Sequence, residues 1–343
     1  MIPGAVPLLV LAAVVAALIA AAWGYFVRIE MPRPPIGTYE SSDIVVMSVM
    51  VIVAPLAYLA LPRTAVAAIF GLIMFGGVRL ALSPLLGARV ALAGAALLCG
   101  ATVAAWLLHR AGSTEALNDA VLAIAVVGVA NLWVQSGMRA SQLTAFATML
   151  TAYDLTATTL TTVMTRFATQ VQGLAFAPLF VISTGRAPVG IGLGDLLMLV
   201  LFPLAAAKAF GRAAGLTAAV AAVLVTALVA LLLGLGVLGP AVPVLTLLGP
   251  VICGQYAFWR RSGYQERTVA QWRAGAPANT VTHDALGALQ AAWSLPIPEP
   301  CNKGVWVAID AGRVVGSGAS MGLARKSARQ NGHTGVPIVK QTT

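Results

Sequence analysis

Long apolar stretches, separated by short polar breaks, dominate the first three quarters of the chain. Each has about the length that an α-helix needs to cross a bilayer, roughly 17–25 residues. Nine stretches can be delimited, at 5–27, 43–62, 64–84, 88–109, 117–138, 141–165, 189–210, 214–238 and 241–259. The pattern predicts an all-α polytopic membrane domain over residues 1–260, with about nine transmembrane helices.

After residue 260 the pattern changes. Residues 261–302 read as a polar linker that becomes Pro-rich near its end, and residues 303–343 alternate like a small soluble α+β module. Its predicted elements are strands at 305–309 and 313–315, a helix at 319–330 and a last strand at 336–339. About forty residues make a small core. We therefore expect this ββαβ module to lean on the membrane domain, a second copy of the chain or a partner.

Composition agrees with a surface that mostly faces lipid. Hydrophobic residues make up 59% of the 343 residues and charged residues 9%, whereas a soluble domain carries about 25% charged residues. The first stretch has no basic segment before it and is longer than the apolar part of a signal peptide, so we expect it to be a retained span. The Ala-, Gly- and Arg-rich composition is typical of a GC-rich prokaryotic genome, which favours a multi-pass protein of a prokaryotic plasma membrane.

Charge and metal-binding residue types exclude several other functions. The net charge is +10, but basic residues lie mostly at span ends and in the tail, where membrane orientation accounts for them. We therefore expect no nucleic-acid partner. The three cysteines and three histidines are scattered, without disulfide or zinc spacing, so we expect no metal and no cofactor. Residues 318–322 match G-x-S-x-G, but no large parallel sheet surrounds them, and we assign no catalytic serine.

Two aspartates, Asp154 and Asp195, lie well inside apolar stretches. Between Asp43 and Glu266 the only other acids are Glu115 and Asp119. Insertion scales give a cost of about 2.5–3.5 kcal/mol for an aspartate at the centre of a membrane helix. Two such residues need a reason, and the leading one is a paired acid/base site.

The residues around these aspartates carry further information. Gly192 and Gly194 precede Asp195. Without a Cβ atom they allow a neighbouring backbone to approach and loosen the helix locally. Pro243, at the start of the last stretch, removes a backbone donor. Irregular backbone is tolerated inside a membrane only where it is buried or faces a wet cavity.

These elements, in this order on three late helices, resemble the presenilin and signal peptide peptidase family of GxGD intramembrane aspartyl proteases. Tyr153-Asp154 and Gly192-Leu193-Gly194-Asp195 match the family pattern in full, and Pro243-Val244-Leu245 departs from Pro-Ala-Leu only at its middle residue. Val244 is larger than alanine, which puts the packing beside the site in question. Lys208 also looks presenilin-like. The resemblance covers residues 1–260 and not the tail.

The resemblance implies an aspartic endopeptidase that hydrolyses peptide bonds within transmembrane helices of membrane-protein substrates. The catalytic pair would be Asp154 and Asp195, without a cofactor. The supporting or substrate-binding residues would be Tyr153, Gly192, Leu193, Gly194, Pro243, Val244 and Leu245. Two carboxylates held close in a low-dielectric site share one proton, so that one activates a water and the other donates to the scissile carbonyl. An extended substrate could pair with backbone near Pro243 to Leu245.

Three other functions remain open from the residues alone. Each aspartate could be structural, paired with Arg79 or capping a half-helix. The pair could serve a proton-coupled transporter or channel. The chain could also be a catalytically silent scaffold that binds transmembrane helices. Self-association is left open.

The remaining intramembrane polar residues suggest structural roles. We expect Asn131 and Gln135 to join helices, Asn118 and Asp119 to mark a helix start, and Lys208 to anchor at the membrane interface.

Basic residues at span ends predict the orientation. With nine spans, one face carries Arg63, Arg110, Arg166 and Arg186, and the other carries Arg28, Arg33, Arg89, Arg139, Lys208, Arg212, Arg260 and Arg261. The excess predicts a cytoplasmic C-terminus. A signal peptide peptidase-like orientation of this kind favours substrates with a cytoplasmic N-terminus.

Overall fold

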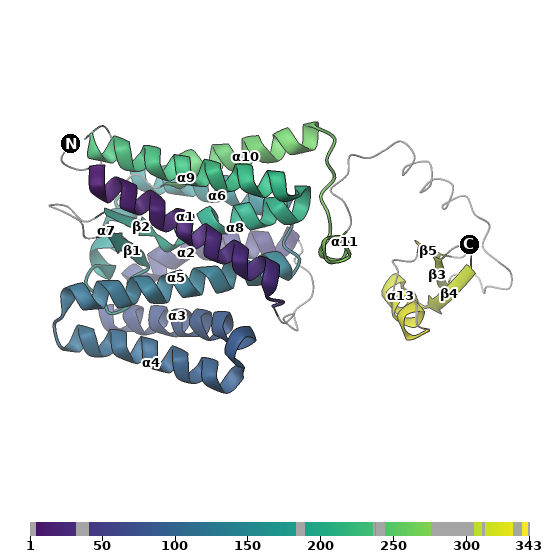
Figure 1. Cartoon of the computed structure of the whole chain (residues 1–343), viewed down its shortest axis with the longest axis horizontal. Helices are drawn as coiled ribbons and strands as arrows, with labels where there is room; N and C mark the ends of the chain where they lie inside the picture. Colours follow the sequence, from purple (N-terminus) through teal and green to yellow (C-terminus); the bar gives the residue numbers. More distant parts are fainter. Residues whose placement is uncertain are drawn as a thin grey trace. The chain divides into compact units, whose positions relative to one another are not determined.

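A computed structural model describes residues 5–31, 41–182, 189–235, 237, 244–275, 305–310, 313–331 and 338–341. The chain divides into two compact units, Met1–Ala278 and Asn279–Thr343. The first is a helical bundle and the second contains a small sheet (Figure 1).

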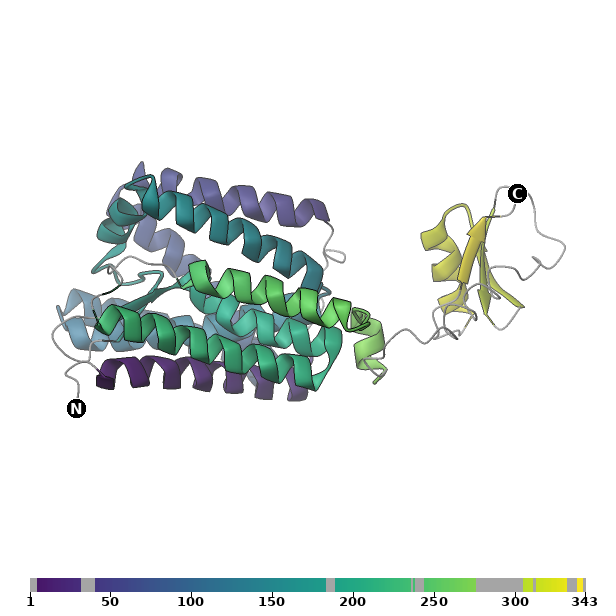
Figure 2. The same ribbon diagram turned by 90° about the horizontal axis from the view of Figure 1, so that it is seen from above.

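Long helices that run side by side make up the first unit (Figures 1 and 2). In the described residues they are α1 (Ala5–Arg28), α2 (Ser41–Leu59), α3 (Arg63–Leu86), α4 (Ala88–Leu107), α5 (Ala111–Gln135), α6 (Ala140–Thr159), α8 (Leu193–Phe210), α9 (Arg212–Gly234) and α10 (Leu245–Arg261). Two short helices, α7 (Val163–Val171) and α11 (Val269–Arg273), accompany them. The prediction of a polytopic helical architecture for this part of the chain is thus supported in its main feature, and the hairpin described below departs from an all-α fold.

Seven of the described helices, α1 to α5, α8 and α9, are long and apolar enough to cross a membrane. Helices α6 and α10 fall short of that description for different reasons. Six threonines and Asp154 dilute the apolar character of α6, whereas α10 is only 17 residues long and contains Pro250. The structure therefore supports seven spans by length and composition, against the nine predicted.

Helix α6 ends earlier than predicted, at Thr159 rather than at residue 165. Hydroxyl groups at its end bond main-chain carbonyls of the preceding turn, from Thr156 to Ala152 O and from Thr159 to Leu155 O. Such side chains compete with the backbone and weaken a helix. Residues 163–171 form the separate helix α7 instead.

A small antiparallel hairpin follows α7. Its strands are β1 (Leu179–Ile182) and β2 (Val189–Gly192), with Leu179 opposite Gly192. The helix predicted from residue 189 thus begins only at Leu193, because the Gly-rich run before it has low helix propensity. The segment between α7 and β1 is apolar, and its residues Leu174 and Phe176 are buried in the bundle core. We call this end of the unit, next to the N-terminus in Figure 1, the hairpin end, and the opposite end the α11 end.

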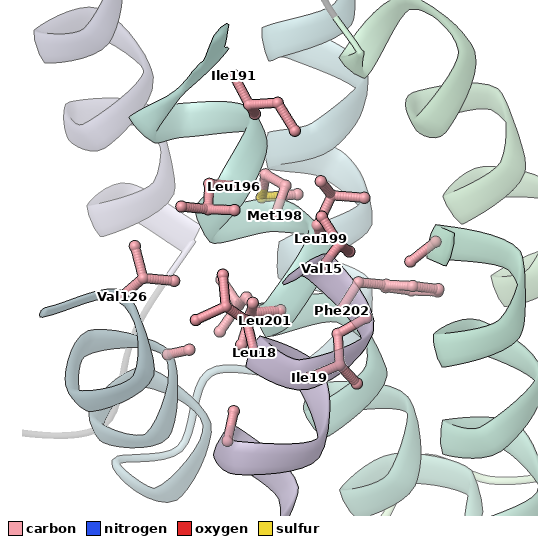
Figure 3. Close-up of a cluster of buried hydrophobic side chains, with 14 of the residues drawn as sticks. Val15, Leu18, Ile19, Val126, Ile191, Leu196, Met198, Leu199, Leu201 and Phe202 are labelled. Atoms are coloured by element: carbon pink, nitrogen blue, oxygen red, sulfur yellow. The ribbon is translucent and has the colours of Figure 1, made fainter. Parts of the chain in front are cut away.

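Helix α8 lies at the centre of the bundle. Within its membrane-length window 78% of residues are buried, more than in the other six candidate spans. Leu196, Met198, Leu199, Leu201 and Phe202 of α8 meet side chains of α1, of α5 and of β2 (Figure 3). A helix that is apolar on all sides is expected in such a place. Asp195 stands in the first turn of this central helix.

Amides of α5 join it to α1, as predicted. Asn131 Nδ2 donates to Ala22 O at 3.2 Å. Gln135 Nε2 donates to Ile29 O at 3.0 Å, and Gln135 Oε1 accepts from Met31 N at 2.9 Å. Interhelical hydrogen bonds of this kind contribute about 0.6 kcal/mol each in membranes, so the three together fix the register of α1 against α5.

The second unit contains a three-stranded antiparallel sheet and one helix. Strand β3 (Trp306–Asp310) lies between β4 (Arg313–Gly318) and β5 (Ile338–Gln341). Helix α13 (Met321–Gln330) packs so closely on the sheet that a Cβ atom at Gly316 would overlap the main chain of Ala328. Ser320, in the G-x-S-x-G match, is the N-cap of α13 and accepts from Leu323 N at 3.3 Å. A capping role accounts for this serine.

Candidate active site

Asp154 and Asp195 come from different helices and lie close enough to interact electrostatically. Asp154 belongs to the interior of α6 and is 9% exposed. Asp195 belongs to the first turn of α8 and is partly exposed. Helices α6, α8 and α10 are mutual neighbours. The fold therefore brings together two acidic residues that are 41 positions apart in the sequence.

Asp195 caps the start of α10. Its Oδ1 atom accepts from Leu245 N at 3.1 Å, and the Val244 amide also interacts with the carboxylate. The amide groups at a helix N-terminus have no intrahelical partners and favour an anion. This contact is the capping role that the structural alternative expected, and it orients the carboxylate.

Asp154 has no comparable contact. In the described ranges its carboxyl group takes part in no hydrogen bond or ion pair, although its side chain is almost fully buried. Capping therefore accounts for Asp195, whereas no such contact in the described residues accounts for Asp154.

The main chain of Leu245, at the start of α10, is bonded to both α8 and α6. Its N–H donates to Asp195, and its carbonyl accepts from Thr151 Oγ1 at 3.2 Å. Thr151 stands three positions before Asp154 on α6. Thr151 was not among the predicted site residues. A hydroxyl group close to an aspartate in an apolar stretch was the feature that could have indicated it.

The closest approach of two helices at the site involves Gly249, which sequence analysis also missed. A Cβ atom at this position of α10 would overlap Thr151 Oγ1 and lie 2.9 Å from Thr151 Cβ. The Gly249-Pro250 pair in the middle of an apolar stretch was the available signal. Gly249 lets α10 approach α6 at Thr151, whose hydroxyl group also donates to Leu245 O one turn earlier on α10.

The predicted supporting residues surround the pair with different degrees of burial. Val244 and Leu245 are buried, at 5% and 2% exposure, and Leu193 is partly buried. The Tyr153 hydroxyl is buried and has no hydrogen-bond partner in the described residues. Pro243 lies outside the described residues.

The glycines before Asp195 do not serve a tight helix contact. A Cβ atom at Gly192 would lie 3.7 Å from Asp195 Oδ2, an ordinary van der Waals distance, and one at Gly194 would meet nothing within 4 Å. The expected close approach of a neighbouring backbone is therefore wrong for both positions. Their small size instead leaves space beside the carboxylate.

Asn118 and Asp119 do not mark a helix start, because α5 begins at Ala111. Their side chains bond the hairpin instead. Asn118 Nδ2 donates to Ala177 O and to Leu179 O, each at 3.1 Å, and Asp119 Oδ1 accepts from Val181 N at 3.0 Å. The two residues fix β1, and with it the hairpin that leads into Asp195.

Lys208 is not an interface anchor. Its side chain is 1% exposed, and its ammonium group donates to Val134 O at 3.1 Å and to Met138 O. Glu266 accepts from Ala140 N at the start of α6. Arg267 donates from Nε to Lys208 O and from Nη2 to Ala207 O, both at 2.8 Å. We call Lys208, Glu266 and Arg267 the polar clasp. It holds the start of α6 to the end of α8, at the α11 end.

Arg79 is not placed to pair with the aspartates. It is exposed on α3, which packs mainly against α4 and α5.

Among the described residues, no three His, Cys, Asp or Glu side chains gather as metal ligands would. Comparisons with protein-family models, with curated proteins and with solved structures give no match.

Proposed function

We propose that the chain is an intramembrane aspartyl protease that hydrolyses peptide bonds within transmembrane helices of membrane-protein substrates. The observation that carries the proposal is that the neighbouring helices α6 and α8 bring Asp154 and Asp195 together, while among the described residues no hydrogen bond or ion pair accounts for the buried Asp154. The Tyr-Asp, Gly-x-Gly-Asp and Pro-x-Leu elements resemble those of presenilins and signal peptide peptidases, and they support the same function.

The chemistry follows from two carboxyl groups that share a site of low dielectric. They are not both easily ionised, so they hold one proton between them. The ionised member takes a proton from a water as it attacks the scissile carbonyl carbon. The protonated member donates to the carbonyl oxygen, which gives a tetrahedral intermediate. When this intermediate collapses, the C–N bond breaks, the carboxyl group that took the proton of the water gives it to the leaving nitrogen, and the other carboxylate regains its proton from the hydroxyl group. Leu245 N–H holds Oδ1 of Asp195, which fixes the orientation of this carboxylate for the reaction.

We further propose that α6 and α10 also cross the membrane, which would give nine spans. The threonines of α6 support this, because their hydroxyl groups bond carbonyls of the preceding turn. Thr144 donates to Ala140 O and Thr148 donates to Thr144 O. A hydroxyl that is satisfied within its own helix lowers the cost of placing it in lipid.

The distribution of basic residues supports a cytoplasmic location for the α11 end. Arg28, Arg89, Arg139, Arg212 and Arg260 lie at helix ends there, and cytoplasmic segments carry an excess of such residues. We propose a prokaryotic plasma membrane as the location, and substrates whose N-terminus is cytoplasmic.

The test is cleavage of a fluorescently labelled single-span protein by the full chain in liposomes, with products mapped by mass spectrometry. Wild type should cut within the span, and Asp154→Asn and Asp195→Asn should not. Asp119→Asn is a matched control, because it neutralises an intramembrane acid outside the pair and keeps an oxygen that accepts from Val181 N. Cleavage that persists in either pair variant would overturn the proposal. Proton flux through wild-type liposomes without cleavage of any of several single-span proteins would favour a transporter.

A further inference from the structure

A cavity of about 460 Å³ opens at the α11 end of the first unit. It lies between the end of α1, the junction of α8 with α9, and α11. Its volume falls within the usual range for small-molecule sites, about 300–1,000 Å³. The tryptophans and arginines that line it are Trp23, Arg28, Arg212, Arg267, Trp272 and Arg273. The aspartate pair is not among its lining residues, so the cavity is separate from the candidate active site.

Positive charge dominates this cavity. Among the described residues, four arginines line it, and Glu30 is the one lining carboxylate. Glu30 contacts Arg273 at 3.6 Å. Burial also lowers the pKa of Arg267 below its ordinary value, because it disfavours the charged form. Like charges gathered in one cavity repel each other, and an anion between them would remove that penalty.

The lining elements are held in place before any ligand arrives. Arg267 is fixed by its bonds to Lys208 O and Ala207 O. Gly211, with a φ of 101°, makes the turn from α8 to α9 that positions Arg212 at the first residue of α9. The ring of Trp272 stacks on Phe26 with 4.4 Å between centroids, which ties α11 to α1. Such preorganisation reduces the entropy lost on binding.

We propose that this cavity binds the phosphate group of an anionic phospholipid headgroup. Guanidinium groups match phosphate oxygens in a planar, two-pronged geometry. Tryptophans such as Trp23 and Trp272 favour the depth of lipid headgroups. Basic pockets between transmembrane helices are suited to such headgroups on the cytoplasmic side. A bound headgroup would join α1, the α8–α9 junction and α11 next to the polar clasp. Lipid binding in this cavity does not require that the chain be a protease, because the aspartates do not line it.

The test is titration of the full chain, purified in a neutral detergent, with short-chain phosphatidylglycerol, followed by tryptophan fluorescence. Phosphatidylcholine, inorganic phosphate and glycerol 3-phosphate are separate arms. The double variant Arg28→Gln/Arg212→Gln removes two charges from the cavity. Its matched control, Arg89→Gln/Arg260→Gln, removes two exposed charges at the same end but outside the cavity. Glu30→Gln removes the lining carboxylate.

Phosphatidylglycerol should bind wild type and the control double variant equally. It should bind Arg28→Gln/Arg212→Gln roughly 25-fold more weakly, at about fivefold for each charge. Glu30→Gln should bind it about fivefold more tightly by the same reckoning. Competition by inorganic phosphate or glycerol 3-phosphate at similar concentrations would identify a soluble phosphate as the ligand and overturn the lipid assignment. Equal binding by the two double variants, or binding of phosphatidylcholine as tight as that of phosphatidylglycerol, would overturn the site.

Discussion

Helix α8 has an ionisable side chain near each end, Asp195 in its first turn and Lys208 in its last turn. The surroundings of these two side chains differ. At the hairpin end, Asp195 has a backbone donor on one oxygen and interacts with Asp154, which has no bond of its own in the described chain. At the α11 end, the ammonium group of Lys208 is buried and donates to Val134 O in the last turn of α5 and to Met138 O just after it. In the described residues, Asp195 and Lys208 thus both bond the main chain of a neighbouring segment, whereas Asp154 beside Asp195 has no such partner.

This difference separates function from architecture within one helix. A buried polar group with a full set of partners stabilises one arrangement of the chain. A buried carboxyl group without such partners requires another explanation, and a catalytic role is one that fits Asp154. Substitutions at the Asp154 and Asp195 end should therefore change activity more than stability, and those at the Lys208 end should do the opposite.

The largest expected effect is on activity at the aspartate end. Asp154→Asn or Asp195→Asn should lower kcat by at least about 10³-fold, because each removes one half of the acid/base pair. The midpoint of thermal unfolding should change little, since asparagine keeps the oxygen that Leu245 N–H requires. Activity assays beside tryptophan-monitored unfolding in detergent would check both statements. A large loss of stability in Asp154→Asn would indicate a structural role instead.

The largest expected effect on stability is at the other end. Lys208→Met keeps the volume of the side chain but leaves Val134 O and Met138 O without their donor. We expect a loss of about 3 kcal/mol in the free energy of unfolding, measured by denaturant titration in mixed micelles. The activity of the molecules that remain folded should fall less than tenfold. A stable Lys208→Met with no activity would reverse the comparison.

An intermediate effect is expected where α10 meets α6. Gly249→Ala places a methyl group against Thr151, and overpacking of this kind costs about 1–3 kcal/mol. Gly254→Ala, on the same helix, meets nothing within 4 Å and should leave stability unchanged or slightly raised. Unfolding midpoints of the two variants give the comparison. Equal midpoints would show that the α6–α10 contact does not depend on Gly249.

The smallest expected effect concerns one hydroxyl group. Thr151→Val removes the bond to Leu245 O and should cost about 1 kcal/mol. Because Leu245 also orients Asp195, kcat should fall several-fold. Thr144→Val is the control, since the hydroxyl group of Thr144 bonds Ala140 O of its own helix and no other helix in the described part of the chain. If the two variants lose activity equally, then the bond between Thr151 and Leu245 does not help to orient Asp195.

Sequence patterns predicted the helical bundle and the pair of aspartates, because apolar length and intramembrane charge are properties of local sequence. They did not predict how the helices meet. Gly249 and Thr151 become partners only when α6 and α10 pack, and the burial of Lys208 depends on the end of α5. The hairpin before Asp195 was missed because apolar residues such as Val189 and Ile191 fit a helix or a strand equally well in a short run.

The most direct measurement is the affinity of a hydroxyl-containing transition-state analogue for four proteins: wild type, Asp154→Asn, Asp195→Asn and the double variant. If the two aspartates act as one acid/base unit, each single variant should lose nearly all of the affinity that the double variant loses, at least about 100-fold. If the two single losses are instead small and their free energies add to that of the double variant, the aspartates act independently and the proposed catalytic pair is wrong.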